Sequence, residues 1–233
     1  MSDLNLSVVG GAFLIEESDD NEIFIPEEMN EEQKMVKQMC QDFLENEILA
    51  NMDDLEDKDK HGINVELMDK MGELGLLGSH MPEKYGGMQL DTNTNTIISE
   101  TLGPSGSFAV SYAAHIGIGM LPILYFGTQE QKDQYLPRLV SGELKACYCL
   151  TEPSSGSDAL AAKTTAVLND AGTHYMLTGQ KMWISNAGFA DVFIVFAKID
   201  GEKFTGFIVE KGADGMSLGA EEDKLGIRGS STR

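Results

Sequence analysis

The sequence has few basic residues and no long apolar run. Only 17 Lys and Arg stand against 38 Asp and Glu among 233 residues, so the formal net charge is -21. Because proteins neutralise nucleic-acid phosphates with a basic face, this balance argues against a nucleic-acid partner. No stretch of about 18 consecutive apolar residues is present, and we therefore expect no membrane span.

Cysteine is also scarce, and the three cysteines, Cys40, Cys147 and Cys149, lack a metal-type spacing. On a strand, Cys147 and Cys149 would share one side but point in directions that disfavour a bridge. Free buried thiols in a reducing compartment are the simplest interpretation. The four histidines show no spacing typical of a triad or a metal site, and the N-terminus lacks the basic start of a secretory signal. We expect a cytoplasmic protein without a metal.

The common nucleotide and hydrolase motifs are missing as well. There is no G-x-x-x-x-G-K-[ST], and Gly117-Ile-Gly119 lacks the third glycine and the preceding strand of a dinucleotide fingerprint. Ser157 follows Gly156, but no G-x-S-x-G elbow surrounds it. Hydrolase and P-loop functions are therefore disfavoured.

Apolar residues recur every three or four positions from about residue 30 to 142, which predicts a helical domain. Two pairs are typical of helix capping boxes, Asn30 with Gln33 and Thr128 with Gln131. Another helix starts near Ser107, and its Ala- and Gly-rich stretch 109–120 suits a close neighbouring backbone or a flat ligand equally well. The predicted apolar faces consist of Met35, Val36, Met39, Cys40, Phe43 and Leu44; Val65, Leu67, Met68, Met71 and Leu74; and Ile97, Ile98, Thr101 and Leu102.

After Gly142 the apolar period changes to two, which predicts strands. The runs 169–172 and 200–201 have the composition of hairpin turns. An α+β chain follows, with an N-terminal extension (1–29), an all-α helical domain (30–142) and a β-barrel domain (143–233). The predicted strands are 146–150, 164–168, 175–177, 192–197 and 204–209.

Two segments are candidates for binding a ligand. The loop 151–158 carries several hydroxyls, and the backbone around Gly156 suits close approach of a pyrophosphate, although an ordinary Ser-Gly loop is the alternative. Trp183, the single tryptophan, is either a core residue or a platform for a ring, with Ser185 available as a hydrogen-bond partner. Their combination favours a flat ligand that carries phosphate.

At these residues the chain resembles the acyl-CoA dehydrogenases, flavoproteins that oxidise fatty acyl thioesters to trans-2-enoyl thioesters. The likeness runs from about residue 30 to 233, and Ser185 with the loop 153–158 looks most like the very-long-chain branch and related bacterial enzymes. It rests on several motifs in order: Gly75-Leu-Leu-Gly78, Pro82-Glu-Lys-Tyr-Gly-Gly87, Phe126-Gly-Thr-Gln-Glu-Gln-Lys132, Leu150-Thr-Glu-Pro-Ser-Ser-Gly-Ser-Asp158, Gly179-Gln-Lys-Met-Trp-Ile-Ser-Asn186, Phe204-Thr-Gly-Phe-Ile-Val-Glu210 and Lys224-Leu-Gly-Ile-Arg228.

The resemblance implies a set of site residues. It places Thr151 at the edge of the FAD ring, Ser157 in the phosphate region where it also meets the acyl-CoA substrate, and Trp183 over the ring with Ser185 near N5. It implies that residues 113–119 help to line an acyl channel with Met120, Leu121, Ile123 and Leu124. The full set of expected FAD-binding residues is Tyr148, Leu150, Thr151, Gly156, Ser157, Trp183, Ile184 and Ser185.

The chemistry also needs a carboxylate base, which the family takes from a third, all-helical domain after the β-domain. We expect that glutamate, and the family's C-terminal helical bundle, to lie beyond Arg233, so that this chain is a fragment inactive alone. The resemblance implies electron-transfer flavoprotein as acceptor and a homo-oligomer for the full-length enzyme. An acyl-CoA oxidase or flavin monooxygenase of the same fold, or a non-catalytic binding or assembly fragment, are the alternatives.

Overall fold

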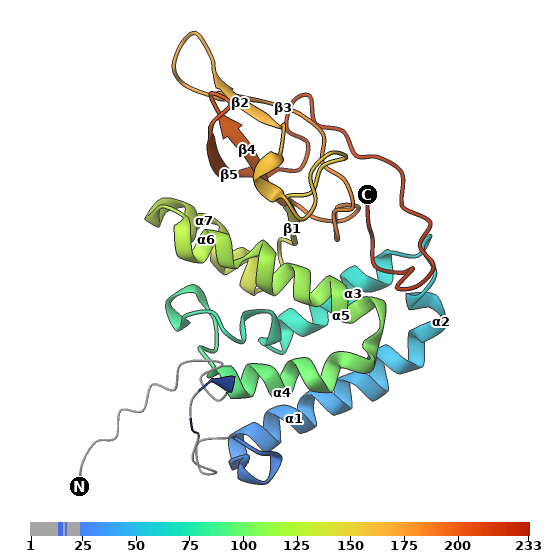
Figure 1. The fold of residues 1–233 in the computed structure, drawn as a ribbon. Coiled ribbons are helices and arrows are strands. Elements are labelled where there is room, and N and C mark those ends of the chain that lie inside the picture. Colours follow the sequence, from blue (N-terminus) through green and yellow to red (C-terminus); the bar gives the residue numbers. More distant parts are fainter. Residues whose placement is uncertain (1–13, 16, 18–23) are drawn as a thin grey trace, which may run out of the picture.

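Helices make up the first part of the chain and strands the second. The computed structural model describes residues 14, 15, 17 and 24–233. In Figure 1 the helices form the lower layers and the sheet lies above them. The helices are α1 (Glu31–Phe43), α2 (Met52–Leu55), α3 (Gly62–Glu73), α4 (Thr92–Leu102), α5 (Ser107–Ala113), α6 (Leu121–Phe126) and α7 (Gln129–Val140), and the strands are β1 (Ala146–Cys149), β2 (Thr165–Leu168), β3 (Tyr175–Thr178), β4 (Val192–Ile199) and β5 (Lys203–Glu210).

Both predicted capping boxes are present. The Asn30 side chain accepts the Gln33 backbone N–H at 2.8 Å, and the Gln33 side chain accepts the Asn30 N–H at 3.0 Å. Thr128 and Gln131 open α7 in the same way. These reciprocal bonds satisfy backbone donors that no earlier turn of the helix pairs. Both helix starts are therefore fixed by local chemistry.

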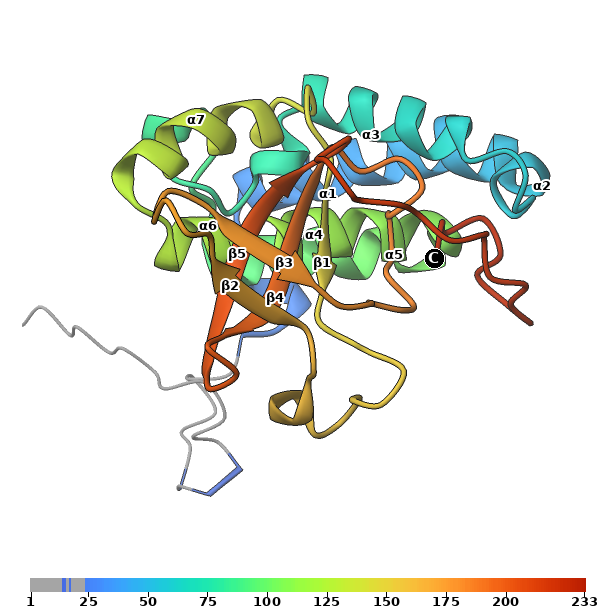
Figure 2. The same ribbon diagram turned by 90° about the horizontal axis from the view of Figure 1, so that it is seen from above.

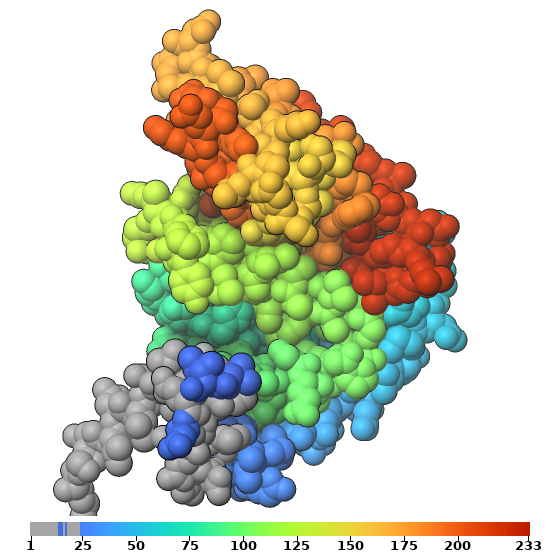
Figure 3. All heavy atoms as spheres, viewed as in Figure 1, coloured from blue at the N-terminus to red at the C-terminus, as the bar shows by residue number. Residues whose placement is uncertain are grey.

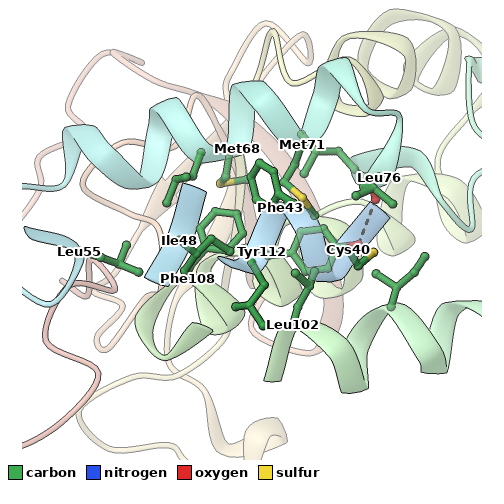
Figure 4. Close-up of a cluster of buried hydrophobic side chains, with 14 of the residues drawn as sticks. Cys40, Phe43, Ile48, Leu55, Met68, Met71, Leu76, Leu102, Phe108 and Tyr112 are labelled. Carbon is green, nitrogen blue, oxygen red and sulfur yellow. Dashed lines mark hydrogen bonds between the residues drawn. The ribbon is translucent and has the colours of Figure 1, made fainter. Parts of the chain in front are cut away.

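The main hydrophobic core lies among α1, α3, α4 and α5. Figure 4 shows Phe43 of α1 and Phe108 of α5 facing the methionines of α3, and the Tyr112 hydroxyl donates to the Leu76 carbonyl at 3.0 Å. The predicted stripe on α1 is wrong at Met35, which is 66% exposed because it lies beside the buried arc that Val36 and Cys40 occupy. Leu74 is also 38% exposed, because α3 ends one residue before it.

The strands form one mixed sheet. β4 pairs in parallel with β1 and β2 along one edge and antiparallel with β5 along the other, while β3 pairs with β2. Asp200 and Gly201, which join β4 to β5, both have positive φ, as a tight hairpin turn requires. Figure 2 shows β2 and β3 crossing over β4 and β5, and the rings of Tyr175 and Phe207 meet with centroids 5.6 Å apart. The prediction of a helical domain followed by a β-domain is confirmed.

His115 and Lys145 join the helices to the first strand. The buried His115 Nδ1 accepts the Ala146 N–H at 3.0 Å, so Nε2 carries the proton and donates to the Leu139 carbonyl at 3.0 Å. Lys145 Nζ donates to the Gly142 carbonyl at 2.6 Å and pairs with Asp69 of α3. These bonds fix β1 against α7 and α3, so the two parts of the chain pack as one body at this junction.

Residues 211–233 follow β5 as an irregular segment that returns to the helices. Figure 3 shows this segment, in red, lying against the helical layer near α2. The Gly229 carbonyl accepts the Asn64 side-chain amide of α3 at 2.8 Å, and Arg228 N–H reaches Glu56 at 3.1 Å. A side chain at Gly229 would overlap the Leu55 carbonyl, so glycine is needed for this close approach.

One stretch, Ser107–Phe126, is long and apolar enough to cross a membrane by length and composition, with a mean hydropathy of 1.5. The sequence itself predicts no membrane span, because it has no run of about 18 consecutive apolar residues. Half of it is buried inside the structure, where α5, a π-helical turn at Ala114–Gly119 and α6 pack against the rest of the chain. This burial is typical of a core helix, so length and composition alone are weak evidence for a span.

Candidate functional site

The loop after β1 leaves the sheet through a tight turn. Backbone bonds between Glu152 and Ser155 run in both directions, at 3.0 and 3.1 Å, and the Ser155 hydroxyl donates to the Asp158 carbonyl at 2.8 Å. This turn projects Gly156 and Ser157 into solvent. A Cβ on Gly156 would meet open space, so packing within the chain does not require glycine there.

Tyr148 and Leu150 lie where the strand gives way to this loop. The Tyr148 ring packs on Phe196 of β4 with centroids 4.8 Å apart, and its partial burial raises the pKa of its hydroxyl. Leu150 is half-buried, and its carbonyl accepts a hydrogen bond from Lys181 Nζ at 3.0 Å. The end of β1 is therefore held from both the sheet and the later segment.

Trp183 is not a core residue, because 61% of it is exposed. Its φ of 58° lies in the left-handed region, which few non-glycine residues adopt without a compensating constraint. The next residue, Ile184, is buried against Cys147, Cys149 and Phe193, and Ser185 forms a β-bridge with Thr232. The indole thus stands out from a backbone that is anchored directly after it.

The structure brings the two candidate segments together. The Met182 N–H donates to the Thr151 carbonyl at 3.0 Å, so the residue before Trp183 is paired with the first residue of the hydroxyl loop. Within the described part of the chain, the hydroxyls of Thr151, Ser157 and Ser185 make no hydrogen bond. Free hydroxyls and an exposed indole therefore belong to neighbouring segments.

An ion pair that the sequence did not predict joins the same two segments. Lys181 Nζ lies 2.7 Å from Glu152 Oε1, and both side chains are nearly buried. Burial alone would raise the pKa of Glu152, but hydrogen bonds from Lys181, Thr164 and two backbone N–H groups lower it to about 2. The carboxylate is therefore charged at neutral pH. The signal was present in the sequence as an acidic and a basic residue inside the two quoted motifs.

The Trp183 segment is also tied to the helices and to the C-terminal residues. Asn186, with a φ of 68°, is buried, and its side-chain amide donates to the Ser111 carbonyl of α5 at 2.8 Å. Ile184 N–H donates to the Arg233 carbonyl at 2.7 Å, and Asn186 N–H to the Ser231 carbonyl at 2.8 Å. The segment is a short bridge between α5 and the end of the chain.

The candidate channel residues divide into packed and open positions. Met120 and Ile123 are buried in the core between α7 and the sheet, and a Cβ on Gly119 would lie 2.8 Å from the Ala146 Cβ. Packing therefore explains Gly119. A Cβ on Gly117 would meet no atom within 4 Å, and the adjacent Ile118 is about half exposed, at 48%, so the chain itself leaves space beside this part of the π-helical turn.

Comparisons with known proteins identify the same family for both the helical and the strand-containing part of the chain. Residues 30–143 match the model of the acyl-CoA dehydrogenase N-terminal domain, and residues 147–233 match that of the middle domain. A probable acyl-CoA dehydrogenase of Bacillus subtilis is 55% identical over 96% of this chain, and the human very long-chain specific acyl-CoA dehydrogenase, mitochondrial, is 44% identical over 69% of it.

A solved structure has the same fold. The acyl-CoA dehydrogenase complexed with FAD from Bacillus anthracis is 52% identical, with a TM-score of 0.93 over 97% of this chain. The chain spans only 38% of the Bacillus subtilis relative, 26% of the human relative and 39% of the Bacillus anthracis chain. With both domain models and these relatives in agreement, the chain belongs to the acyl-CoA dehydrogenase family.

Proposed function

We propose that the loop at 148–157 and the segment at 183–185 together bind FAD. The observation that carries this proposal is the backbone bond from Met182 to Thr151, which pairs the loop with the segment that bears the indole. The residues present fit such a ligand. The Thr151 hydroxyl is free, the backbone at Gly156 is open, and Trp183 is exposed in a constrained conformation, where an aromatic ring finds a stacking surface.

Each residue has a separate task in this proposal. Tyr148, Leu150 and Ile184 supply backbone and packing around the ring, and Thr151 bonds its edge. The Trp183 indole covers the ring, and Ser185 bonds near N5. Gly156 and Ser157 face the phosphates, and Ser157 also contacts the acyl-CoA; with a net charge of -21, local donors must position these anions against the overall field.

For the whole protein we propose α,β-dehydrogenation of fatty acyl-CoA thioesters to trans-2-enoyl-CoA in β-oxidation. The flavin, when bound, supplies the hydride acceptor. The residues of this chain bind and orient it, and the indole covers one face against water. Electron-transfer flavoprotein as acceptor, a homo-oligomer and a cytoplasmic location complete the proposal; the family membership supports the reaction class.

The base that removes the α proton is proposed to lie outside these 233 residues. Glu152 is a poor candidate because four donors surround its carboxylate and hold its pKa near 2, whereas a base needs a pKa near neutrality. The Bacillus subtilis relative and the Bacillus anthracis chain are each more than twice as long as this chain, which supports a longer enzyme whose remaining part supplies the glutamate. We accordingly propose that residues 1–233 alone are catalytically inactive.

A titration of the 233-residue chain with FAD tests the site. Trp183 is the only tryptophan, so its emission reports directly on a stacked ring. We expect saturable quenching, and Trp183→Ala should weaken FAD binding, measured by flavin fluorescence, by about tenfold. Tyr125→Ala, which removes a similarly exposed ring from α6, is the matched control and should leave the affinity unchanged. Quenching that never saturates, or equal losses in both variants, would contradict the proposal.

A further inference from the structure

The Glu152–Lys181 pair lies between the two proposed flavin segments, and nothing in the proposed chemistry uses it. The side chains are only 4% and 10% exposed, and Nζ lies 2.7 Å from Oε1. Lys181 Nζ also donates to the Leu150 carbonyl at 3.0 Å. One ammonium group therefore links the carboxylate with the backbone immediately before Thr151.

The Glu152 carboxylate also accepts hydrogen bonds from a third segment, residues 163–164 at the entry to β2. Its Oε2 accepts the Lys163 N–H at 2.6 Å, and its Oε1 accepts the Thr164 N–H at 3.0 Å and the Thr164 hydroxyl at 2.5 Å. The hydroxyl loop, the entry to β2 and Lys181 thus meet at one charged group. A buried ion pair often stabilises a fold no better than apolar residues of similar volume. Stability alone therefore does not explain this pair, and its effect on the arrangement of the surrounding segments is the alternative.

The geometry concerned is that of Trp183. Its left-handed backbone is held on both sides. The Lys181 ion pair and the bond from Met182 N–H to the Thr151 carbonyl precede it, and the bond from Ile184 N–H to the Arg233 carbonyl, at 2.7 Å, follows it. Strained backbone conformations persist only where the surroundings fix them. The indole, which is exposed, owes its direction to these three attachments.

We propose that Glu152 and Lys181 are a positioning pair for flavin binding, which sets the separation between the Thr151 loop and the Trp183 indole without contacting the ligand. The inference rests on the proposed function, namely that these segments bind FAD. The ion pair thus belongs to the cofactor site, although the Glu152 and Lys181 side chains are enclosed by the protein.

Lys145 provides a matched control within the same chain. Its side chain is similarly buried, at 8% exposed, and also joins one carboxylate, Asp69, which is 52% exposed, to one backbone carbonyl, that of Gly142. It stands at the junction of α7 and β1, and its partners belong to neither flavin segment. Removing either charge should lower stability, but only Lys181 should change the indole.

The first experiment measures Trp183 emission and anisotropy in the 233-residue chain without FAD, for Lys181→Met, Lys181→Arg and Lys145→Met. We expect lower anisotropy and red-shifted emission in Lys181→Met, recovery in Lys181→Arg, and no change in Lys145→Met, with urea unfolding midpoints reduced in both methionine variants. If Lys181→Met does not fold, Thr164→Val removes one bond to Glu152 without leaving a charge unpaired and should produce a smaller change of the same kind.

The second experiment titrates the same variants with FAD. Lys181→Met should raise the Kd by about tenfold, and Lys145→Met should leave it unchanged. Unaltered anisotropy and Kd in folded Lys181→Met, or equal changes in Lys145→Met, would overturn the positioning role. A wild-type chain that does not bind FAD, while its Trp183 signal still responds to Lys181→Met, would contradict the proposed function and leave the positioning role standing.

Discussion

Replacing Glu152 with glutamine tests how strongly one carboxylate stabilises the fold. Its pKa falls from an ordinary 4.5 to about 2 in the folded protein, despite the opposing effect of burial, because Lys181, Thr164 and two backbone N–H groups donate to it. Because each pH unit is worth about 1.4 kcal/mol, this lowering of the Glu152 pKa corresponds to about 3 kcal/mol of stability at neutral pH. Because the folded pKa is the lower one, this contribution is complete above about pH 5 and is lost as the pH falls toward 2.

The assay is urea unfolding followed by far-UV circular dichroism at several pH values. Glu152→Gln should be less stable than wild type by about 3 kcal/mol at pH 7, and the gap should narrow as the pH falls from 5 toward 2. Other groups that titrate there are shared by both proteins and cancel in the difference. Glu202→Gln, in the exposed turn before β5, is the control and should show no gap. A gap that stays constant with pH would refute the assignment of an ionised, hydrogen-bonded Glu152.

Two further perturbations test the attachments around the site. Burial lowers the pKa of His115 to about 4, so protonation opposes folding as the pH falls from about 6.5 to 4; His115→Gln should flatten the unfolding free energy across that range in the same urea assay. Gly229→Ala should reduce the unfolding free energy by about 1–3 kcal/mol and speed proteolysis within residues 211–228, because the added methyl group overlaps the Leu55 carbonyl. Gly226→Ala, which meets open space, should change neither; equal effects of the two alanines would contradict the close-contact explanation.

Features that depend on neighbouring residues could be predicted from the sequence. The capping boxes at Asn30 and Thr128 each need only a partner three residues later, and the turn at Asp200-Gly201 needs only two residues that tolerate positive φ. The change of period after Gly142 separated helices from strands for the same reason. The prediction that Met35 is buried was wrong because residue spacing defines the edge of an apolar arc only to within about one residue.

Features that depend on distant partners could not be predicted in this way. The two candidate segments were expected to share one ligand, but no local pattern indicates the backbone bond between residues 151 and 182 that joins them. Glu152 and Lys181 are 29 positions apart, so sequence spacing does not indicate that folding encloses them as a pair. Likewise, no local pattern shows that Gly229 would return to Asn64, some 165 positions earlier. Long-range register decides such contacts.

The returning C-terminal segment has very little slack. The Gly229 carbonyl binds Asn64 of α3, and the Ser231 carbonyl, two positions later, binds the Asn186 N–H. Two residues span at most roughly 7 Å even when fully extended. A displacement of α3 is therefore transmitted through residues 229–231 to Asn186, which lies three residues after Trp183. A ligand or partner that displaces α3 would therefore alter the backbone next to Trp183 without contacting the indole.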